Sequence, residues 1–140
     1  MASFTPESRA FISQGTRTGK LATVRADGRP HVVPIWFVLD GDTLVFNTGN
    51  TTIKGKNLRR TGQACISVDD EAPPYSFAMI EGTVTLSEDL AEMKLWATKI
   101  AARYMGDALA ESFGTRNAVP GELLVRLTPI NVIFVRDLAS

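Results

Sequence analysis

Leu44-Val-Phe-Asn-Thr-Gly-Asn-Thr-Thr-Ile-Lys-Gly-Lys-Asn-Leu-Arg-Arg60 is the segment that decides the fold. Its first five residues suit a β-strand, Asn47-Thr-Gly-Asn50 has turn chemistry, and Thr51 or Thr52 can cap a short helix ending near Arg60. A helix start offers free N–H groups and partial positive charge, which predicts a phosphate site beside Lys54 and Lys56. Alternatively, this basic run is the solvated face of a surface helix.

The composition predicts one globular domain over residues 1–140. Fifteen basic residues balance fifteen acidic ones, which gives no argument for a nucleic-acid or membrane partner. The single cysteine, Cys65, excludes an internal disulfide and suits a reducing cytoplasm. Neither a secretory signal nor an apolar run of membrane-spanning length is visible, so a cytoplasmic location is expected.

The first half of the chain predicts a short helix and a β-meander. The helix begins at Thr5-Pro6 and ends near Gly15. Asp27-Gly28 and Asp40-Gly41-Asp42 are hairpin signals. They separate strands predicted at Lys20–Arg25, His31–Leu39 and Thr43–Thr48. Pro34 cannot donate to a ladder, so its strand is expected at an edge or bulged there.

The second half predicts three more strands and a long helix. Gly82 is a candidate bulge, Pro129 interrupts the last strand, and residues 106–121 are expected to be irregular or weakly helical. The long helix is expected to start at Ser87 and to carry an apolar stripe of core residues (Leu90, Met93, Ala97, Ile100, Ala101 and Tyr104). The predicted strands are Gln63–Asp69, Tyr75–Leu86 and Leu123–Arg136. The fold class is therefore mainly β: a six-stranded antiparallel barrel with one long and two short helices.

Side-chain chemistry for catalysis is sparse. His31 is the only histidine and has no serine partner in a recognisable motif, so it is expected to be structural or substrate-facing, and Cys65 to be a buried hydrophobe. One histidine and one cysteine cannot build a closed zinc site, and no nucleotide-binding glycine motif is present. The sequence therefore predicts no catalytic residue and no metal site.

Aromatic strand residues and the basic turn are what remain. The aromatic residues are Trp36, Phe37, Tyr75 and Phe77, and together with Lys54 they suit a flat aromatic cofactor that carries a phosphate. The cofactor would then supply the chemistry and the protein would orient it. The alternative is that these aromatic side chains are ordinary core.

Four segments, in order, resemble one known family. They are Lys20–Phe37, Ile53-Lys-Gly-Lys-Asn-Leu-Arg-Arg60, Phe77–Leu86 with its Ile-Glu-Gly-Thr-Val core, and Arg126–Val135. They are similar to the split β-barrel flavin and deazaflavin oxidoreductases, the pyridoxamine 5′-phosphate oxidase-like superfamily. The resemblance implies a split β-barrel, a homodimer with a cofactor site at the subunit interface, and a small-molecule substrate.

Two cofactors are compatible with that resemblance. Flavin mononucleotide (FMN) members usually meet the phosphate with an Arg-Lys pair, whereas Ile53 precedes Lys54 here. The Arg-x-His substrate segment of the oxidases is also not expected after Asp137-Leu-Ala-Ser140. The chain looks more like the branch that uses coenzyme F420 and transfers hydride to unsaturated or conjugated acceptors. The alternatives are an FMN flavoprotein, a non-catalytic cofactor carrier, and a barrel with a degenerate site. The sequence does not name the acceptor.

The resemblance also implies roles for individual residues. Lys54 would meet the phosphate with help from Lys56 and Asn57. Val33, Pro34 and Trp36 would lie along the ring, and Asn47 and Thr48 would reach its polar edge or ribityl chain. Tyr75 and Phe77 would close the site, either from the same subunit or from the other subunit.

Overall fold

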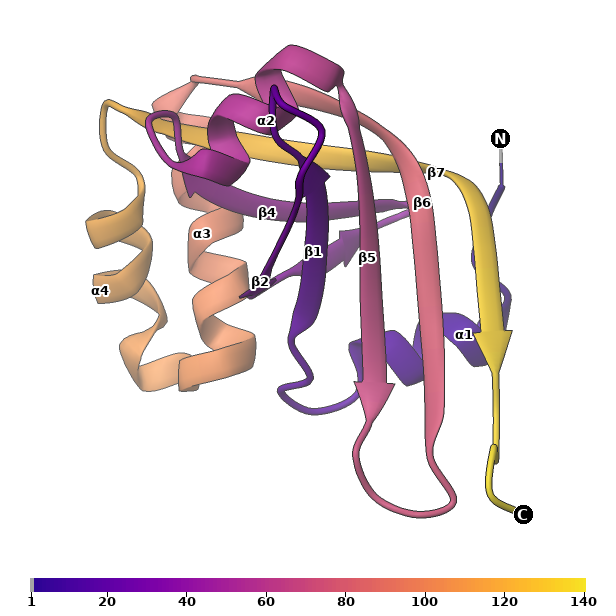
Figure 1. Cartoon of the computed structure of the whole chain (residues 1–140). Helices are drawn as coiled ribbons and strands as arrows, with labels where there is room; N and C mark the ends of the chain where they lie inside the picture. The colour runs from indigo at the N-terminus through magenta and orange to yellow at the C-terminus, as the bar shows by residue number, and fades with distance from the viewer. Residues whose placement is uncertain (1) are drawn as a thin grey trace.

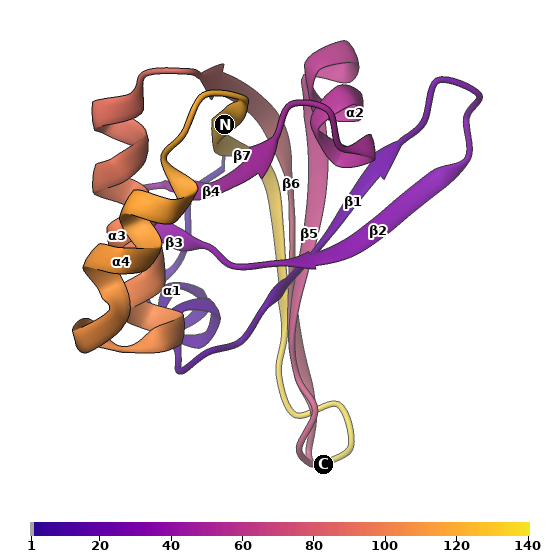
Figure 2. The same ribbon diagram turned by 90° about the vertical axis from the view of Figure 1, so that its left-hand side faces the viewer.

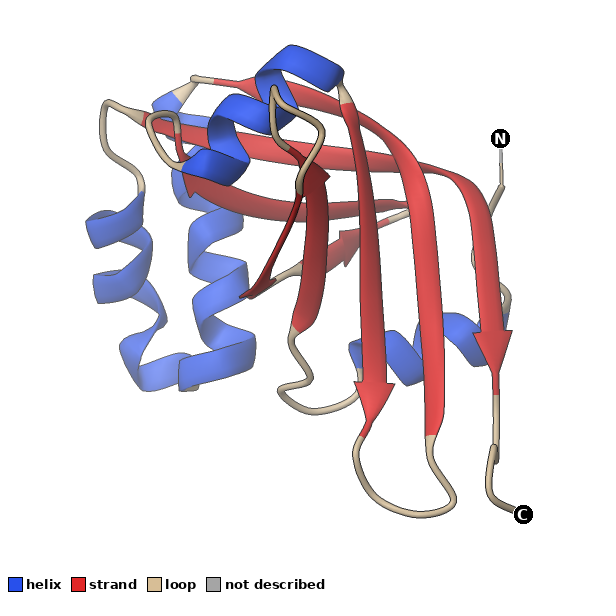
Figure 3. Cartoon of the chain, in the orientation of Figure 1, coloured by secondary structure: helices blue, strands red, loops and turns tan. Residues whose placement is uncertain are grey.

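One curved antiparallel sheet forms the body of the protein in a computed structural model that describes residues 2–140 (Figures 1 and 3). Its seven strands follow the order β2-β1-β5-β6-β7-β4-β3, and every neighbouring pair is antiparallel. The strands are β1 (Gly19–Val24), β2 (Pro30–Ile35), β3 (Val38–Asp40), β4 (Thr43–Gly49), β5 (Gln63–Asp70), β6 (Ser76–Ser87) and β7 (Glu122–Val135). The predicted mainly β, antiparallel split-barrel class is confirmed, with seven strands instead of six.

The additional strand arises because the predicted strand His31–Leu39 is broken at Trp36 and Phe37. The N–H of Phe37 donates to the Tyr104 hydroxyl (3.2 Å), and its carbonyl accepts from Arg103 (2.7 Å). Side chains of a helix thus take the backbone groups that a continuous ladder would use. As a result β2 and β3 lie at opposite edges of the sheet order although only two residues join them. The edge position expected for Pro34 is confirmed.

A bulge bends the two longest strands. The pairing between β6 and β7 shifts at Glu81 and Gly82, where Gly82 faces Pro129. A Cβ at Gly82 would lie 2.2 Å from the carbonyl oxygen of Thr128, so only glycine fits. The bulge expected at Gly82 and the interruption expected at Pro129 are therefore one feature.

Four helices surround the sheet, and one of them corrects the prediction. They are α1 (Pro6–Ser13), α2 (Ile53–Thr61), α3 (Leu90–Met105) and α4 (Asp107–Asn117). Residues 106–121, expected to be irregular or weakly helical, contain the regular helix α4, which lies beside α3 (Figure 2). Its only buried residues are Ala110 and Gly114, so its sequence shows little amphipathic pattern. Close packing replaces that pattern, because a Cβ at Gly114 would lie 2.0 Å from Thr98 Oγ1.

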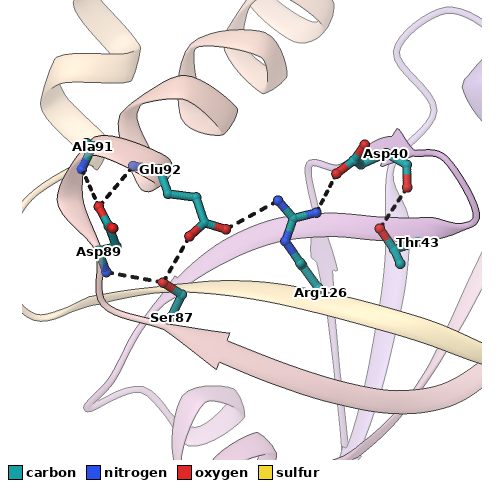
Figure 4. A network of polar contacts seen from close by, with 7 residues as sticks. All are labelled: Asp40, Thr43, Ser87, Asp89, Ala91, Glu92 and Arg126. Atoms are coloured by element: carbon teal, nitrogen blue, oxygen red, sulfur yellow. Dashed lines mark hydrogen bonds and ion pairs between the residues drawn. The ribbon is translucent and has the colours of Figure 1, made fainter.

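Helix α3 begins at Leu90, later than the start expected at Ser87, and a polar network ties it to the sheet (Figure 4). Asp89 caps it by accepting from the N–H groups of Ala91 and Glu92, whereas Ser87 still belongs to β6. Arg126 of β7 pairs with Asp40 of β3 (2.6 Å) and with Glu92 of α3 (3.3 Å). These contacts dock the N-terminal turn of α3 against the edge of the sheet.

Alternation along the strands produces two apolar clusters. Leu44 and Phe46 of β4 point into the barrel core, whereas Val45 faces α3 and packs with Met93 and Trp96. Of the predicted α3 stripe, Leu90 stays exposed. Within residues 2–140, no helix has the length and apolar character needed to cross a membrane.

Candidate functional site

A cavity of about 350 Å³ lies between the sheet, the start of α2 and the α3–α4 pair. Its size is in the range of small-molecule sites. One wall is apolar and the other carries polar groups. The lining residues are Thr18, Pro34, Ile35, Trp36, Asn47, Lys54, Ala97, Ile100, Ala101 and Asn117.

The polar wall centres on the turn from β4 into α2. Thr52 caps α2 by accepting from the N–H of Gly55 (3.1 Å), and its hydroxyl also donates to the carbonyl of Gly49 (2.7 Å). A Cβ at Gly55 would lie 2.2 Å from that carbonyl oxygen, so glycine lets the helix start pack directly on the strand end. The N–H groups of Ile53 and Lys54, in the first turn, have no partner inside the helix. This turn therefore presents the positive end of the helix dipole beside Lys54.

Lys54 is available to a ligand. It is half-buried, lines the cavity, and forms no ion pair within residues 2–140. The side chains of Thr18, Asn47 and Asn117 also line the cavity and make no side-chain hydrogen bond in that part of the chain. The cavity thus offers one cation and several unused donors and acceptors.

The apolar wall is built around Trp36. Its indole stacks on Tyr104, with ring centroids 5.1 Å apart, and Phe113 of α4 lies against it at 6.4 Å. The Tyr104 hydroxyl donates to the carbonyl of Arg17 (2.7 Å) and accepts from the N–H of Phe37, so two hydrogen bonds fix the hydroxyl end of the ring beneath Trp36. Burial raises the pKa of Tyr104, which keeps the phenol neutral. Ala97 and Ala101, one turn apart on α3, also line the cavity, and their short side chains leave room for a ligand there.

Glu122 stands next to the polar wall. It begins β7 and pairs with Gly49, the last residue of β4. Its Oε2 atom is buried and has no hydrogen-bond partner within residues 2–140. Burial raises the pKa of Glu122, and the nearby charge of Lys54 partly opposes that shift. No signal in the sequence distinguishes this glutamate from an ordinary acid at a strand start.

The cavity brings together four of the residues predicted from the sequence. Pro34 and Trp36 come from β2 and the break after it, Asn47 from β4, and Lys54 from α2. They are up to 20 positions apart and share one space because only two residues join β2 to β3, which pairs with β4. Their contact with a cofactor stays a prediction.

Six other predicted residues do not line the cavity. Thr48 is buried, with its hydroxyl 3.2 Å from that of Thr52. Asn57 is buried too, and its amide donates to Thr23 Oγ1 (3.0 Å), which ties α2 to β1. Lys56 is exposed on α2, and Val33 is half-buried on β2. Tyr75 and Phe77 lie at the β5–β6 end of the sheet, opposite α2 (Figure 1).

The histidine and the cysteine lie outside this cavity. His31 faces Thr23 on the edge pair, and its Nδ1 is buried without a partner among the described residues. Cys65 is half-buried, and burial raises its pKa, which keeps the thiol protonated. No cluster of three or more potential metal-ligating side chains occurs among the described residues.

Six lining residues were not predicted as site residues. Thr18 and Asn117 lie in segments without a recognisable motif, Ile35 lies within the predicted strand His31–Leu39, and the predicted core stripe includes Ala97, Ile100 and Ala101. The spacing of two small residues at i and i+4 on α3 is the one signal that could have indicated open space beside this helix.

Comparisons with known proteins agree with this architecture. Residues 4–136 match the family model described as pyridoxamine 5′-phosphate oxidase. A curated relative, an F420H2-dependent biliverdin reductase of Mycobacterium tuberculosis (strain CDC 1551 / Oshkosh), is 33% identical over 101 residues, which is 70% of each chain.

Two solved structures have the same fold. One is a conserved hypothetical protein of Mycobacterium tuberculosis, with a TM-score of 0.82 and 21% identity over 100% of this chain and 90% of that one. The other is an F420 reductase, with a TM-score of 0.71 and 24% identity over 92% of this chain and 98% of that one.

Proposed function

Because the chain belongs to the pyridoxamine 5′-phosphate oxidase family, we propose that it is a reductase that uses coenzyme F420 and acts on an unsaturated or conjugated small molecule. The cavity that joins Pro34, Trp36, Asn47 and Lys54 carries this proposal. The 33% identical biliverdin reductase supports the choice of F420 and of a conjugated acceptor. Family membership supports oxidoreductase chemistry more generally.

The residues present fit a flat ring with a phosphate tail. Trp36 and Pro34 would hold the ring, and the unused side chains of Asn47 and Thr18 would meet its polar groups. Lys54 and the first turn of α2 would hold the phosphate, since both favour an anion. The bound deazaflavin supplies hydride-transfer chemistry.

Lys54 is the only titratable side chain among the ten lining residues. The protein is therefore proposed to bind, orient and shield the reactants, not to exchange protons with them. The stacked pair Trp36–Tyr104 and the alanines of α3 would exclude water from one side of the cavity.

Fluorescence titration tests the cofactor. Trp36 lines the cavity and is 37% exposed, whereas Trp96 is 9% exposed and packs elsewhere. We expect F420 to quench the emission at concentrations far below those required for FMN. Trp36→Phe should remove most of the quenching, and Trp96→Phe should keep it. FMN binding more tightly than F420 would favour the second candidate, an FMN flavoprotein, which the family model supports.

Turnover tests the enzyme against a carrier. Reduced F420 is mixed with the protein and a panel of acceptors that includes biliverdin and quinones, and its oxidation is followed by absorbance. Acceptor-dependent oxidation is expected. Tight binding without oxidation by any acceptor would indicate a carrier, and no binding would indicate a degenerate barrel.

A homodimer is proposed as the working form. Tyr75 is 43% exposed and directly precedes β6, at the end of the sheet opposite α2 (Figure 1). It is therefore far from the cavity of its own chain and would contribute to the cavity of a second copy. Sedimentation should give twice the mass of the chain. Tyr75→Ala should weaken F420 binding if the partner contributes this residue, and a monomer that binds F420 normally would contradict the proposal.

A further inference from the structure

Glu122 is brought to the polar wall by backbone pairing. It lies opposite Gly49 in the β4–β7 register, and the N–H of Asn50 donates to the carbonyl of Gly121 (2.8 Å). Gly49 and Asn50 lead directly into the turn that presents Lys54. The carboxylate is therefore fixed beside the anion-binding side of the cavity by the main chain.

The fold itself makes no use of this carboxylate. A Cβ at Gly49 would lie 3.7 Å from Glu122 Oε2, so this oxygen rests against the strand end, where it is buried and unpaired among residues 2–140. A buried carboxylate oxygen without a partner costs stability. Lys54 is close enough for its charge to act on Glu122, yet the two form no ion pair. Lys54 thus stays free for a ligand, and an anion bound to Lys54 would also lie near the charge of Glu122.

We propose that Glu122 makes this anion subsite selective for a singly charged phosphodiester over a doubly charged phosphate monoester. The inference rests on the proposed function only in that a phosphorylated ring occupies the cavity. When Glu122 is ionised, Lys54 and Glu122 together carry no net charge, and the start of α2 adds about half a positive charge. This balance matches one negative charge and not two.

Repulsion provides the discrimination. A phosphate monoester carries a charge of about −1.5 to −2 at pH 7, whereas a diester carries one negative charge. The unfavourable interaction with Glu122 scales with the ligand charge, so it is nearly doubled for the monoester. Specificity through an unfavourable contact is a general device. F420 holds its phosphate as a diester and FMN as a monoester, so Glu122 would favour the deazaflavin.

The test uses two ligands with the same ring. FMN and its phosphate monomethyl ester share the ring and the ribityl chain, and they differ by one methyl group and the charge that it removes from the phosphate. Their dissociation constants are measured by fluorescence at pH 8 and low salt for the wild type, Glu122→Gln and the exposed control Glu88→Gln. We expect the wild type and the control to prefer the ester by roughly tenfold, the scale of one added like-charge interaction at partial screening. In Glu122→Gln this preference should fall to below about twofold.

The outcomes separate this inference from the proposed function. An unchanged ester preference in Glu122→Gln, or failure of both ligands to bind to the wild type and to Glu122→Gln, would overturn the role of Glu122. F420 affinity and turnover, measured on the same proteins, report on the proposed function independently. Circular dichroism of each variant checks that the fold is retained. In 1 M salt the preference for the ester over FMN should disappear, because the charges are then screened.

Discussion

Trp36 and Tyr104 lie face to face, with ring centroids 5.1 Å apart and planes only 3° from parallel. Trp36 follows the last residue of β2, and Tyr104 is near the end of α3, so this contact joins the edge of the sheet to the helical layer. The Tyr104 hydroxyl also holds the backbone at Phe37, where the predicted strand is broken. One side chain therefore both ends the strand and supports the aromatic wall of the cavity.

Replacing Tyr104 separates these two roles. Tyr104→Leu removes the stacked ring, and we expect F420 affinity to fall about three- to tenfold, the worth of one aromatic pair. Tyr104→Phe keeps the ring but leaves the Phe37 N–H without its partner. Its free energy of unfolding should fall by about 1–3 kcal/mol with F420 affinity nearly unchanged. Equal affinities for both variants would show that stacking does not position Trp36.

Lys54 is expected to provide the main charged contact to the cofactor phosphate. Lys54→Ala should weaken binding by about 1.5–3 kcal/mol, the value of one charged hydrogen bond, which corresponds to roughly a tenfold to hundredfold loss of affinity. Lys56→Ala is the matched control, because Lys56 is on the same helix but exposed and outside the cavity. Titration calorimetry with F420 measures both. Similar losses in the two variants would favour a diffuse charge effect over a defined site.

We expect glycine to be required at position 55 because a side chain would not fit there, and not because glycine has a flexible backbone. Alanine in an exposed helix position usually adds about 1 kcal/mol of stability relative to glycine. Here its Cβ would meet the Gly49 carbonyl oxygen, so Gly55→Ala should instead lower the free energy of unfolding by about 1–3 kcal/mol. Urea denaturation gives the sign directly. A stabilised variant would mean that the start of α2 can move away from β4.

Glu122 is expected to make stability depend on pH. Because burial raises its pKa above the ordinary 4.5, the native state holds this proton more tightly than the unfolded chain does. Its contribution to stability is fully present below about pH 4.5 and is lost as the pH rises through the raised native value. The wild type should therefore lose stability relative to Glu122→Gln as the pH rises from 4 to 8. Parallel denaturation midpoints across this range would contradict the assignment.

Local sequence determined much of the fold. The Asp-Gly turns, the Thr52 cap and the alternation of β4 are short-range signals, and each lies where the sequence predicts it. Pro34 lies on an edge strand because proline has no N–H to donate, and the bulge forms at Gly82 because glycine has no Cβ. Both are local properties too. Lys54 was predicted beside an anion site for the same reason, because it adjoins a helix start, and the structure shows that it lines the cavity.

Tertiary structure alone decided the break at Phe37, the helix α4 and the place of Glu122. The break depends on Arg103 and Tyr104, more than 60 positions away, which capture its backbone groups. Helix α4 is held by close packing of Gly114 on α3, and such packing leaves no hydrophobic period in the sequence. Glu122 is placed beside the polar wall of the cavity by the pairing of β7 with β4. Contacts between residues distant in the chain set all three, and no local pattern encodes them.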